Sequence, residues 1–388
     1  MHIILIGNYQ PDKLESMDRF TYMLEMGFRN QGHDVSVWRP KAIIGRVVKS
    51  TTYGIGKWCG YIDKWLLFPL QIKWRLRNKQ LDDKSVFFHI CDHSNAPYLQ
   101  HLPQERSAIT CHDVLAIRGA LGDEDTYCTA SFAGKLLQKW ILGNINNVNR
   151  LACVSQQTLL QLKNIIRENK NQQERWRVIY NGFNAEFKPM EQQEAKSLVN
   201  KTGYKSGAPF ILHVGSGLPR KNRKLLLEMI VVLGQTWKGN VCYAGDAVDK
   251  ELLDHITSFK LNNRVFCIEK PNHATLVALY SSCEAFIFPS FSEGFGWPVI
   301  EAQACGAPVI ASNIEPMPEV SGGAALHVDP NKPEDFAAAL LSLKTISTRT
   351  KLIQLGFNNI MRFETGKMID SYLNLYGSKK YNTDMHVA

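Results

Sequence analysis

The chain has 388 residues, of which 45% are hydrophobic, and its 45 Lys and Arg against 36 Asp and Glu give a formal net charge of +9. This length suits two domains with separate cores and excludes a fibrous or disordered chain. Nine cysteines, an odd count without a Cys-x2-Cys pair, argue against a disulfide framework and a zinc site and fit a reducing compartment. No apolar run reaches the roughly 18 residues of a membrane span. The apolar stretch at the N-terminus is only as long as a strand, so we expect a cytoplasmic protein without a signal peptide.

Strand and helix signals alternate in the first half of the chain. Apolar strands are predicted at residues 2–6, 34–38, 85–90, 108–111 and 150–154, and a helix at 15–29. A second alternating series starts at Phe210, after the Lys- and Gln-rich stretch 188–205, so we place a domain boundary between Phe187 and Gly207. Such alternation is typical of α/β domains with parallel, doubly wound sheets, whose ligands bind beyond the carboxyl ends of the strands.

The segment 41–80 carries most of the net charge. It holds nine Lys and Arg and one acid, Asp63, for a net charge of +8, and aromatic and aliphatic residues are interleaved with them. This pattern predicts a segment that lies on an anionic membrane surface; the alternative is a domain helix with a solvated basic face. Nucleic acid is not expected as a partner, because no helix-turn-helix, zinc or RNP pattern accompanies the charge. The candidate membrane-surface residues are Lys64, Trp65, Lys73, Trp74, Arg75 and Arg77.

A loop with two adjacent basic residues follows the strand that starts at Phe210. The loop 215–222 reads Gly-Ser-Gly-Leu-Pro-Arg-Lys-Asn, and a helix is expected from Arg223. It begins like a dinucleotide fingerprint, but the third glycine would fall at Arg220, which disfavours a nicotinamide dehydrogenase. Arg220 and Lys221 could instead compensate the charge of a diphosphate, the alternative being a solvated basic helix start.

The most informative stretch of the chain is 285–312. An apolar strand at 285–288 leads into a loop, a helix is expected behind Pro298, and a second strand follows at 308–311. Gly294 and Gly296 allow backbone amides to approach a ligand, and a helix N-terminus favours negative charge. The carboxylates of Glu293 and Glu301 are suited to accept paired hydrogen bonds from vicinal hydroxyls. The stretch therefore predicts a site for a phosphate between two sugars.

This stretch resembles the Glu-x7-Glu signature of the retaining nucleotide-sugar glycosyltransferases of family 4, also called group 1. Those enzymes have the GT-B architecture, two Rossmann-like domains whose parallel sheets face a central cleft. The resemblance covers most of residues 178–345, including Pro318-Glu319-Val320. It implies an acceptor-binding domain at 1–187, a donor-binding domain at 188–358, and a helix at about 359–376 that packs back on the first domain.

The resemblance also assigns roles. Glu301 would hold the ribose hydroxyls, Glu293 would face the donor sugar, and Lys221 would clamp the diphosphate. The implied donor-binding residues are Arg220, Lys221, Ser292, Glu293, Gly294, Phe295, Gly296 and Glu301. His112, after the strand 108–111, resembles a family histidine near the donor sugar, although such a histidine is otherwise a packed or capping residue. His112, Lys221 and Glu293 are the catalytic candidates. The sequence lacks the family's arginine nearer the strand, and paired glycines in the first loop.

Asp123-Glu124-Asp125 is an Asp-x-Asp, by which another glycosyltransferase architecture holds a divalent ion, but it lies in a loop after Gly122. Since Arg220 and Lys221 offer positive charge, we expect no metal and no other cofactor. The resemblance implies front-face transfer with retention, from a nucleoside-diphosphate sugar to a glycan or lipid-linked glycan, in polysaccharide biosynthesis, by a protein peripheral on the inner face of the membrane. The alternatives are a nucleotide-sugar 2-epimerase of the same architecture and a catalytically silent membrane-surface protein.

Overall fold

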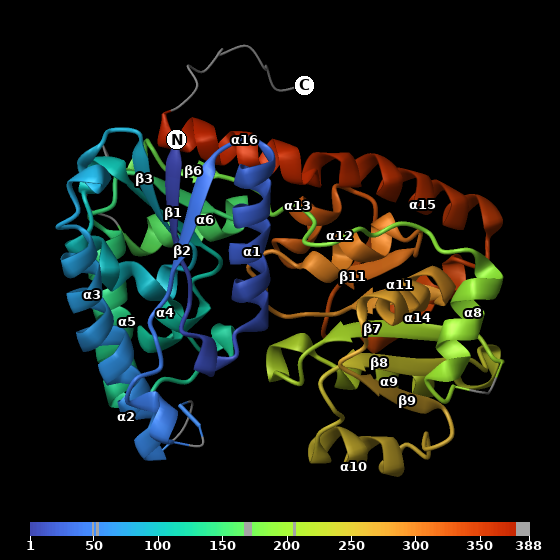
Figure 1. Cartoon of the computed structure of the whole chain (residues 1–388). Helices are drawn as coiled ribbons and strands as arrows, with labels where there is room; N and C mark the ends of the chain where they lie inside the picture. The colour runs from blue at the N-terminus through green and yellow to red at the C-terminus, as the bar shows by residue number, and fades with distance from the viewer. Residues whose placement is uncertain (49, 52–53, 167–172, 205–206, 378–388) are drawn as a thin grey trace. The chain divides into compact units, whose positions relative to one another are not determined.

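The computed structural model describes residues 1–48, 50–51, 54–166, 173–204 and 207–377, and the chain divides into two compact units (Figure 1). The first unit holds the chain up to Gly122, then Cys128–Asn184, and again the chain from Thr365. The second unit holds Asp123–Tyr127 and Ala185–Glu364. Each unit contains one six-stranded parallel sheet. The predicted α/β class with two doubly wound sheets is confirmed.

The first unit is built on a sheet of strand order β2-β1-β3-β4-β5-β6. Its strands are β1 (His2–Ile6), β2 (Asp34–Trp38), β3 (Val86–Ile90), β4 (Ser107–Cys111), β5 (Leu151–Cys153) and β6 (Arg177–Val178). Its helices are α1 (Glu15–Asn30), α2 (Gly54–Ile62), the π-helical turn η3 (Asp63–Leu67), α3 (Phe68–Arg75), α4 (Leu115–Ala120), α5 (Phe132–Ile145), α6 (Gln156–Ile165) and α16 (Thr365–Tyr376), with a longer 3-10 segment, η5 (His93–His101).

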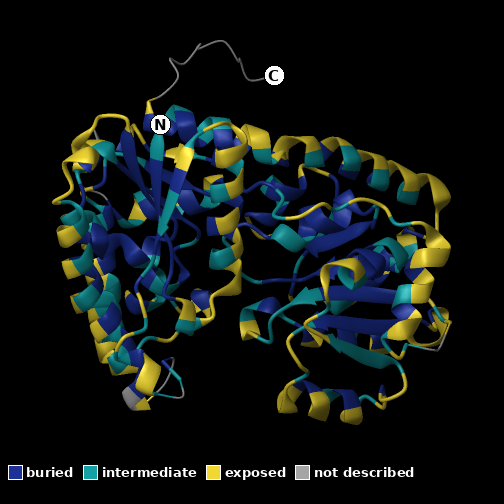
Figure 2. Cartoon of the chain, viewed as in Figure 1, coloured by how far each residue is buried: buried dark blue, intermediate teal, exposed yellow. Residues whose placement is uncertain are grey.

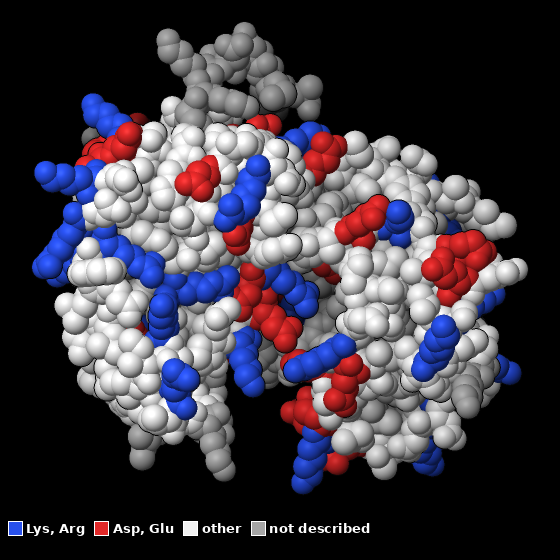
Figure 3. Space-filling view, viewed as in Figure 1, with Lys and Arg blue, Asp and Glu red and all other residues white. Residues whose placement is uncertain are grey.

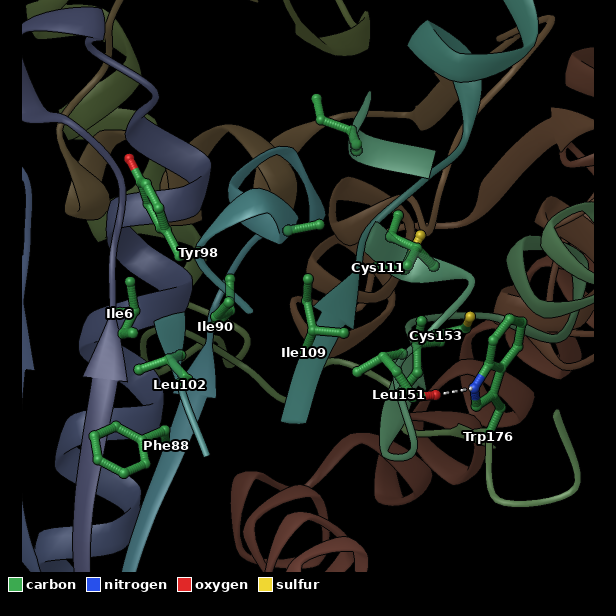
Figure 4. Packing of buried hydrophobic residues seen from close by; sticks show 14 of the residues in the cluster. Ile6, Phe88, Ile90, Tyr98, Leu102, Ile109, Cys111, Leu151, Cys153 and Trp176 are labelled. Carbon is green, nitrogen blue, oxygen red and sulfur yellow. Dashed lines mark hydrogen bonds between the residues drawn. The ribbon is translucent and has the colours of Figure 1, made fainter. Parts of the chain in front are cut away.

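The core of this unit follows from its continuous apolar strands. All five residues of β3 and all five of β4 are buried, as strands covered by helices on both faces must be. Figure 4 shows Phe88, Ile109 and Leu151 from three adjacent strands packed in one cluster, together with Trp176. The indole Nε1 of Trp176 donates a hydrogen bond to the carbonyl of Val148 at 3.1 Å, which satisfies the polar atom of a buried ring.

Helix α16 returns to the first unit after the chain has passed through the second. The ring of Tyr376 stacks on Phe87 with centroids 4.2 Å apart, and a hydrogen bond of 2.8 Å joins the hydroxyl of Tyr372 to Oγ1 of Thr110. A Cβ at Gly182 would lie 2.8 Å from the Cα of Thr365, so glycine there allows the start of α16 to approach. The predicted helix at 359–376 is in fact interrupted, because α15 ends at Ile360 and α16 begins at Thr365.

The second unit has a sheet of strand order β12-β11-β10-β7-β8-β9. Its strands are β7 (Phe210–Gly215), β8 (Asn240–Gly245), β9 (Val265–Glu269), β10 (Ala285–Phe288), β11 (Val309–Ser312) and β12 (Leu326–Val328). Its helices are α8 (Gln192–Lys201), α9 (Lys224–Leu233), α10 (Lys250–Ser258), α11 (His273–Ser282), α12 (Trp297–Ala304), α13 (Met317–Ser321), α14 (Pro333–Ser342) and α15 (Ile346–Ile360). Figure 2 shows the central strands of both sheets buried, the edge strands β2 and β9 partly exposed, and the helices exposed along their outer sides.

Two hydrophobic clusters lie in the second unit, and they follow the pleat of its sheet. Ile211 and Ile287 belong to one cluster, while their strand neighbours Leu212 and Phe288 belong to the other. Since successive side chains point to opposite faces of a sheet, each cluster fills one face under its own layer of helices. Among the helices of the described residues, none is both long and apolar enough to cross a membrane.

Candidate functional site

Two loops of the second unit meet because their strands are neighbours. Strands β7 and β10 are paired in parallel, so the loops that follow them leave the same edge of the sheet. After β7 the chain forms a 3-10 turn at Pro219–Lys221 and then α9. After β10 it forms the loop that leads into α12, with Pro298 in the first turn of that helix as predicted. The backbone amide of Phe291 donates to the carbonyl of Arg220 at 2.8 Å and joins the two loops.

A cluster of three charged side chains lies where these loops meet. The Nζ of Lys221 donates to Oε1 of Glu293 at 2.6 Å, and the guanidinium of Arg220 donates to Oε2 of the same carboxylate at 2.8 Å. Arg220 also donates to the backbone carbonyl of Ser292 at 2.8 Å. The side chains of Arg220, Lys221 and Glu293 are 19%, 10% and 8% exposed. The structure therefore brings together four predicted donor-binding residues, Arg220, Lys221, Ser292 and Glu293. The two cations share the carboxylate of Glu293.

Burial and pairing oppose each other in this cluster. Burial alone would raise the pKa of Glu293, but the charges of Lys221 and Arg220 and their hydrogen bonds outweigh it and hold that pKa below its usual value. Burial lowers the pKa of Lys221, with Arg220 adding to the effect and Glu293 opposing it. We take the three groups to be ionised, since a lysine ammonium and a carboxylate 2.6 Å apart stabilise each other's charge. The cluster has one net positive charge.

The carboxyl ends of β7 and β8 approach each other unusually closely beside this cluster. A Cβ at Gly245 would lie 2.4 Å from the carbonyl oxygen of Gly215, and Gly245 has φ +129. The amide of Asp246 donates to that same carbonyl at 3.2 Å, and the carboxylate of Asp246 accepts from the amide of Gly217 at 3.1 Å. Because residue 245 has no Cβ, the loop that starts at Gly215 can lie directly against the end of β8.

The loop before α12 is held by packing. Gly296 has φ +96, and a Cβ there would lie 2.6 Å from Cε of Met317. Phe295 is buried, with its ring 5.6 Å from that of Phe363. Gly294 lies between this anchored part of the loop and Glu293, so the predicted ligand-facing amides belong to a rigid turn.

Glu301 lies in the middle of α12, where the helix is buried. Only 6% of the residue is exposed, and one carboxylate oxygen accepts a hydrogen bond of 3.0 Å from the hydroxyl of Tyr280 on α11. Burial raises the pKa of Tyr280 well above its usual value, and the carboxylate of Glu301 adds to the effect, so this hydroxyl stays protonated and donates. Tyr280 therefore orients Glu301, a role that the predicted motif did not include.

His112 lies in the first unit, directly after β4. Its ring meets Phe20 edge to face at a centroid distance of 4.5 Å, and Nε2 is 2.8 Å from the carbonyl of Cys91. Since a carbonyl only accepts, Nε2 carries the hydrogen, which leaves Nδ1 as the acceptor in the neutral ring. Burial lowers the pKa of His112, although Asp92 opposes the shift. The ring is thus a packed, neutral imidazole at the carboxyl end of a strand.

The Asp-x-Asp segment forms a turn. Oδ1 of Asp123 accepts from the amide of Asp125 at 3.1 Å and caps the short 3-10 turn Glu124–Thr126. Tyr127, which follows, stacks on Phe291 with centroids 5.3 Å apart, so this segment borders the loop that holds Glu293. Within the described parts of the chain, no three His, Cys, Asp or Glu side chains are grouped so as to hold a metal ion.

The predicted membrane-surface residues fall into two groups. Trp74, Lys73 and Arg77 are exposed. The other three have partners within the first unit: Lys64 pairs with Asp12 at 2.6 Å, Trp65 packs against Tyr98 and Trp140, and Arg75 lies over the ring of Trp38 at 4.8 Å. For Lys64, Trp65 and Arg75 the expectation of a surface role is therefore corrected, because these contacts turn them towards the protein.

One residue near the charged cluster was not predicted. His213 interrupts the apolar run of β7 and is 1% exposed. Its Nδ1 donates to the carbonyl of Ile287 at 3.1 Å, while its Nε2 has no partner among the described residues. Burial lowers its pKa to about 3, which makes it a neutral ring beneath Lys221. A polar residue in the middle of an apolar strand was the signal in the sequence.

Comparison with known proteins gives a family match for most of the second unit. Residues 194–357 match the family model of the glycosyl transferases group 1. O-antigen chain mannosyltransferase B of Escherichia coli is 38% identical over 99 residues, which are 25% of this chain and 26% of that protein. O-antigen chain mannosyltransferase RfbU of Salmonella typhimurium is 28% identical over 151 residues, 38% of this chain and 43% of that protein. This chain thus spans less than half the length of these two relatives.

A solved structure extends the likeness to the whole chain. HepE from Anabaena, determined in complex with UDP and glucose, superposes with a TM-score of 0.71 over 98% of this chain and 100% of that one, at 15% identity. At this identity the likeness concerns the fold, and the fold is GT-B.

Proposed function

We propose, because residues 194–357 match the family model of the glycosyl transferases group 1, that the protein transfers a sugar from a nucleoside-diphosphate sugar to a glycan or lipid-linked glycan, with retention of anomeric configuration, as in family 4. The observation that carries this proposal is the cluster of Arg220, Lys221 and Glu293 between the loops after β7 and β10. Two cations at the carboxyl edge of a parallel sheet are suited to a diphosphate, and Glu293 beside them is suited to the hydroxyls of a sugar.

The proposed reaction is the front-face substitution that the family resemblance implies. The bond between the anomeric carbon and the diphosphate oxygen breaks, and the bond to the acceptor oxygen forms on the same face of the sugar. The proton of the acceptor hydroxyl passes to the departing diphosphate. Lys221 and Arg220 stabilise the charge that develops on this leaving group, and Glu293 binds the sugar rather than acting as nucleophile. Glu301, oriented by Tyr280, binds the ribose hydroxyls.

The roles of the remaining candidates are also proposals. Ser292, Gly294, Phe295 and Gly296 form the rigid turn that borders the donor, and His112 of the first unit binds near the donor sugar. Arg220 and Lys221 provide the charge that a divalent ion would otherwise supply, so the reaction is metal-independent. The names of the two bacterial relatives put mannose first among the sugars to test. A lipid-linked acceptor would fit a protein that attaches peripherally to the inner face of a membrane.

The test is a transfer assay. The protein is incubated in EDTA with UDP- and GDP-hexoses and a lipid-linked oligosaccharide fraction, and nucleoside diphosphate release is measured with the anomeric configuration of the product by proton NMR. We expect acceptor-dependent release and a retained anomer, both lost in Lys221→Ala. Epimerisation of the donor without an acceptor would instead establish the 2-epimerase. Release that needs a divalent ion would refute the metal-independent mechanism, and an inverted anomer would refute retention.

A further inference from the structure

A row of exposed apolar side chains runs along the helical segment from α2 through η3 to α3. Five large hydrophobic residues, each between 38% and 69% exposed, follow one another at intervals of four: Trp58, Ile62, Leu66, Leu70 and Trp74. Isolated exposed hydrophobic residues are common on protein surfaces, but a row of this length is not. We call these five residues the apolar row.

The π-helical turn keeps the apolar row on one face. In an α-helix, a step of four residues advances the side chain by about 40°, so five such positions would spiral away from a single face. The amide of Phe68 bonds to the carbonyl of Asp63, five residues earlier, and this wider turn reverses the drift at the middle of the row. Leu66 and Leu70 therefore stay aligned with Trp58 and Trp74.

A second helix continues this apolar surface. Phe132, Leu136 and Trp140 are exposed at the same four-residue spacing on α5. The rings of Trp140 and Trp65 meet at a centroid distance of 5.3 Å, so the helix of the apolar row and α5 adjoin at this point. Figure 1 shows α3 and α5 along the same side of the first unit. The surface thus contains eight exposed large hydrophobic residues from two helices.

The exposed charged residues of α2 to α3 and of α5 are basic, and the exposed acids Asp82 and Asp83 follow only after Lys79. Exposed basic residues on and after the two helices are Lys57, Lys73, Arg77, Lys79, Lys135 and Lys139. Figure 3 shows Lys and Arg gathered over the part of the first unit where α3 lies. Asp63, an acidic residue between α2 and α3, is 1% exposed. Its carboxylate accepts hydrogen bonds from the hydroxyl of Tyr9 at 2.7 Å, the amide of Ile43 at 3.1 Å and the amide of Gly45 at 2.9 Å. Its charge is therefore directed inward, and the helical faces themselves present basic groups.

We propose that the apolar row and the α5 residues Phe132, Leu136 and Trp140 form a docking surface for an anionic lipid bilayer. The apolar side chains would enter the boundary between headgroups and acyl chains, and the flanking lysines and arginines would meet anionic headgroups. Tryptophan is enriched at this depth. A second copy of the chain is a poorer occupant, because a twofold contact would bring the same basic groups together, and lysine is depleted in protein interfaces. The proposal is independent of the transfer reaction.

The experiment is sedimentation of the full chain with vesicles of phosphatidylcholine alone or with 30 mol% phosphatidylglycerol. Three variants are compared with wild type: Leu66→Asn/Leu70→Asn in the row, Lys73→Glu/Arg77→Glu beside it, and the control Val231→Ser/Val232→Ser, two exposed apolar residues of α9 in the second unit. We expect binding to anionic vesicles, at least tenfold weaker in the first two variants and unchanged in the control. Thermal unfolding of each variant checks the fold.

Two results would overturn the proposal. One is wild-type protein that stays in the supernatant with anionic vesicles, or variants of the row that bind as tightly as wild type. The other is a dimer in sedimentation velocity that Leu66→Asn/Leu70→Asn converts to monomer without any change in vesicle binding, which would assign the surface to a second copy. Nucleotide-induced thermal shifts measured on the same variants keep a failure of the proposed function separate from a failure of this surface.

Discussion

Replacing Glu293 by glutamine would separate the structural role of this carboxylate from its role in the reaction. The carboxylate is shared by Arg220 and Lys221 at 2.8 and 2.6 Å, and loss of one partner of a buried pair costs about 3–5 kcal/mol. Arg220 is partly exposed, and the side-chain oxygen of the new glutamine still accepts a hydrogen bond. We therefore expect a loss of stability at the lower end of this range, about 3 kcal/mol. For a unit of this size, that loss lowers the melting temperature by about 6–12 °C.

The same change should strengthen diphosphate binding. A phosphate that contacts Lys221 from the side opposite Glu293 would lie about 5 Å from that carboxylate, given a charge-assisted bond of ordinary length. At an effective dielectric constant of about 20, two charges at that distance repel by about 3 kcal/mol. Even half of this repulsion corresponds to binding about tenfold tighter in Glu293→Gln. Turnover of the donor should fall at the same time, because the sugar loses its carboxylate.

The assay pairs thermal unfolding with calorimetric titration of UDP and GDP. Glu228→Gln is the matched control, since it breaks a surface Lys–Glu pair on α9, with Lys224 at 2.9 Å, and should cost under about 1 kcal/mol. Because the pKa of Glu293 is held below its usual value near 4.5, wild type should lose this stabilisation as the pH falls below that value, and the variant should not. Weaker diphosphate binding in Glu293→Gln would refute the reasoning.

Three further predictions concern other parts of the two units. Gly245→Ala should destabilise the second unit by about 2–4 kcal/mol in urea unfolding, because its Cβ would lie 2.4 Å from the carbonyl of Gly215. Tyr280→Phe should weaken nucleoside diphosphate binding about three- to tenfold in calorimetry, because Glu301 loses the hydroxyl at 3.0 Å that orients it. The first unit should lose stability as the pH falls from about 6.5 towards 3, because burial lowers the pKa of His89 to about 3 and the fold excludes its charged form; urea midpoints at several pH values check this.

Each of these predictions has its own control. Gly234→Ala places a Cβ where nothing lies within 4 Å, so it reports the cost of backbone strain at φ +49 without a clash. Tyr204→Phe removes another hydroxyl of the second unit, one that donates to the carbonyl of Ala208, and should leave nucleotide affinity unchanged. His89→Gln removes the titrating ring, and an unaltered pH dependence in that variant would contradict the assignment to His89.

The strands were predictable because strands of a doubly wound sheet are buried on both faces. The apolar runs predicted at 2–6 and 285–288 have the same bounds as β1 and β10. The meeting of Arg220 and Lys221 with Glu293 is different. Nothing in the local pattern joins residues so far apart in the chain, and the two loops meet only because β7 and β10 are neighbours in the sheet. The family resemblance implied that these three residues bind the donor, but it was not used to predict this strand pairing.

Side-chain direction in the basic segment was beyond the sequence pattern. The alternation of basic and aromatic residues marked a surface, but it gave Trp65 and Trp74 the same role. The π-helical turn shifts the phase of the helix after Ile62, so that Trp65 packs inward and Leu66 outward. Nor did any pattern indicate that Asp123–Tyr127 groups with the second unit, where Tyr127 stacks on Phe291.

The most direct test of the account is a thermal-shift screen of wild type and Glu301→Ala with UDP, GDP, ADP and NAD. A ligand at about 100 times its dissociation constant adds about 2.7 kcal/mol of stability, which for a unit of this size is a shift of about 5–10 °C. We predict such a shift with at least one nucleoside diphosphate and its loss in Glu301→Ala. A shift with NAD alone, or with none of the four, would contradict the proposal that the loops after β7 and β10 bind a nucleotide sugar.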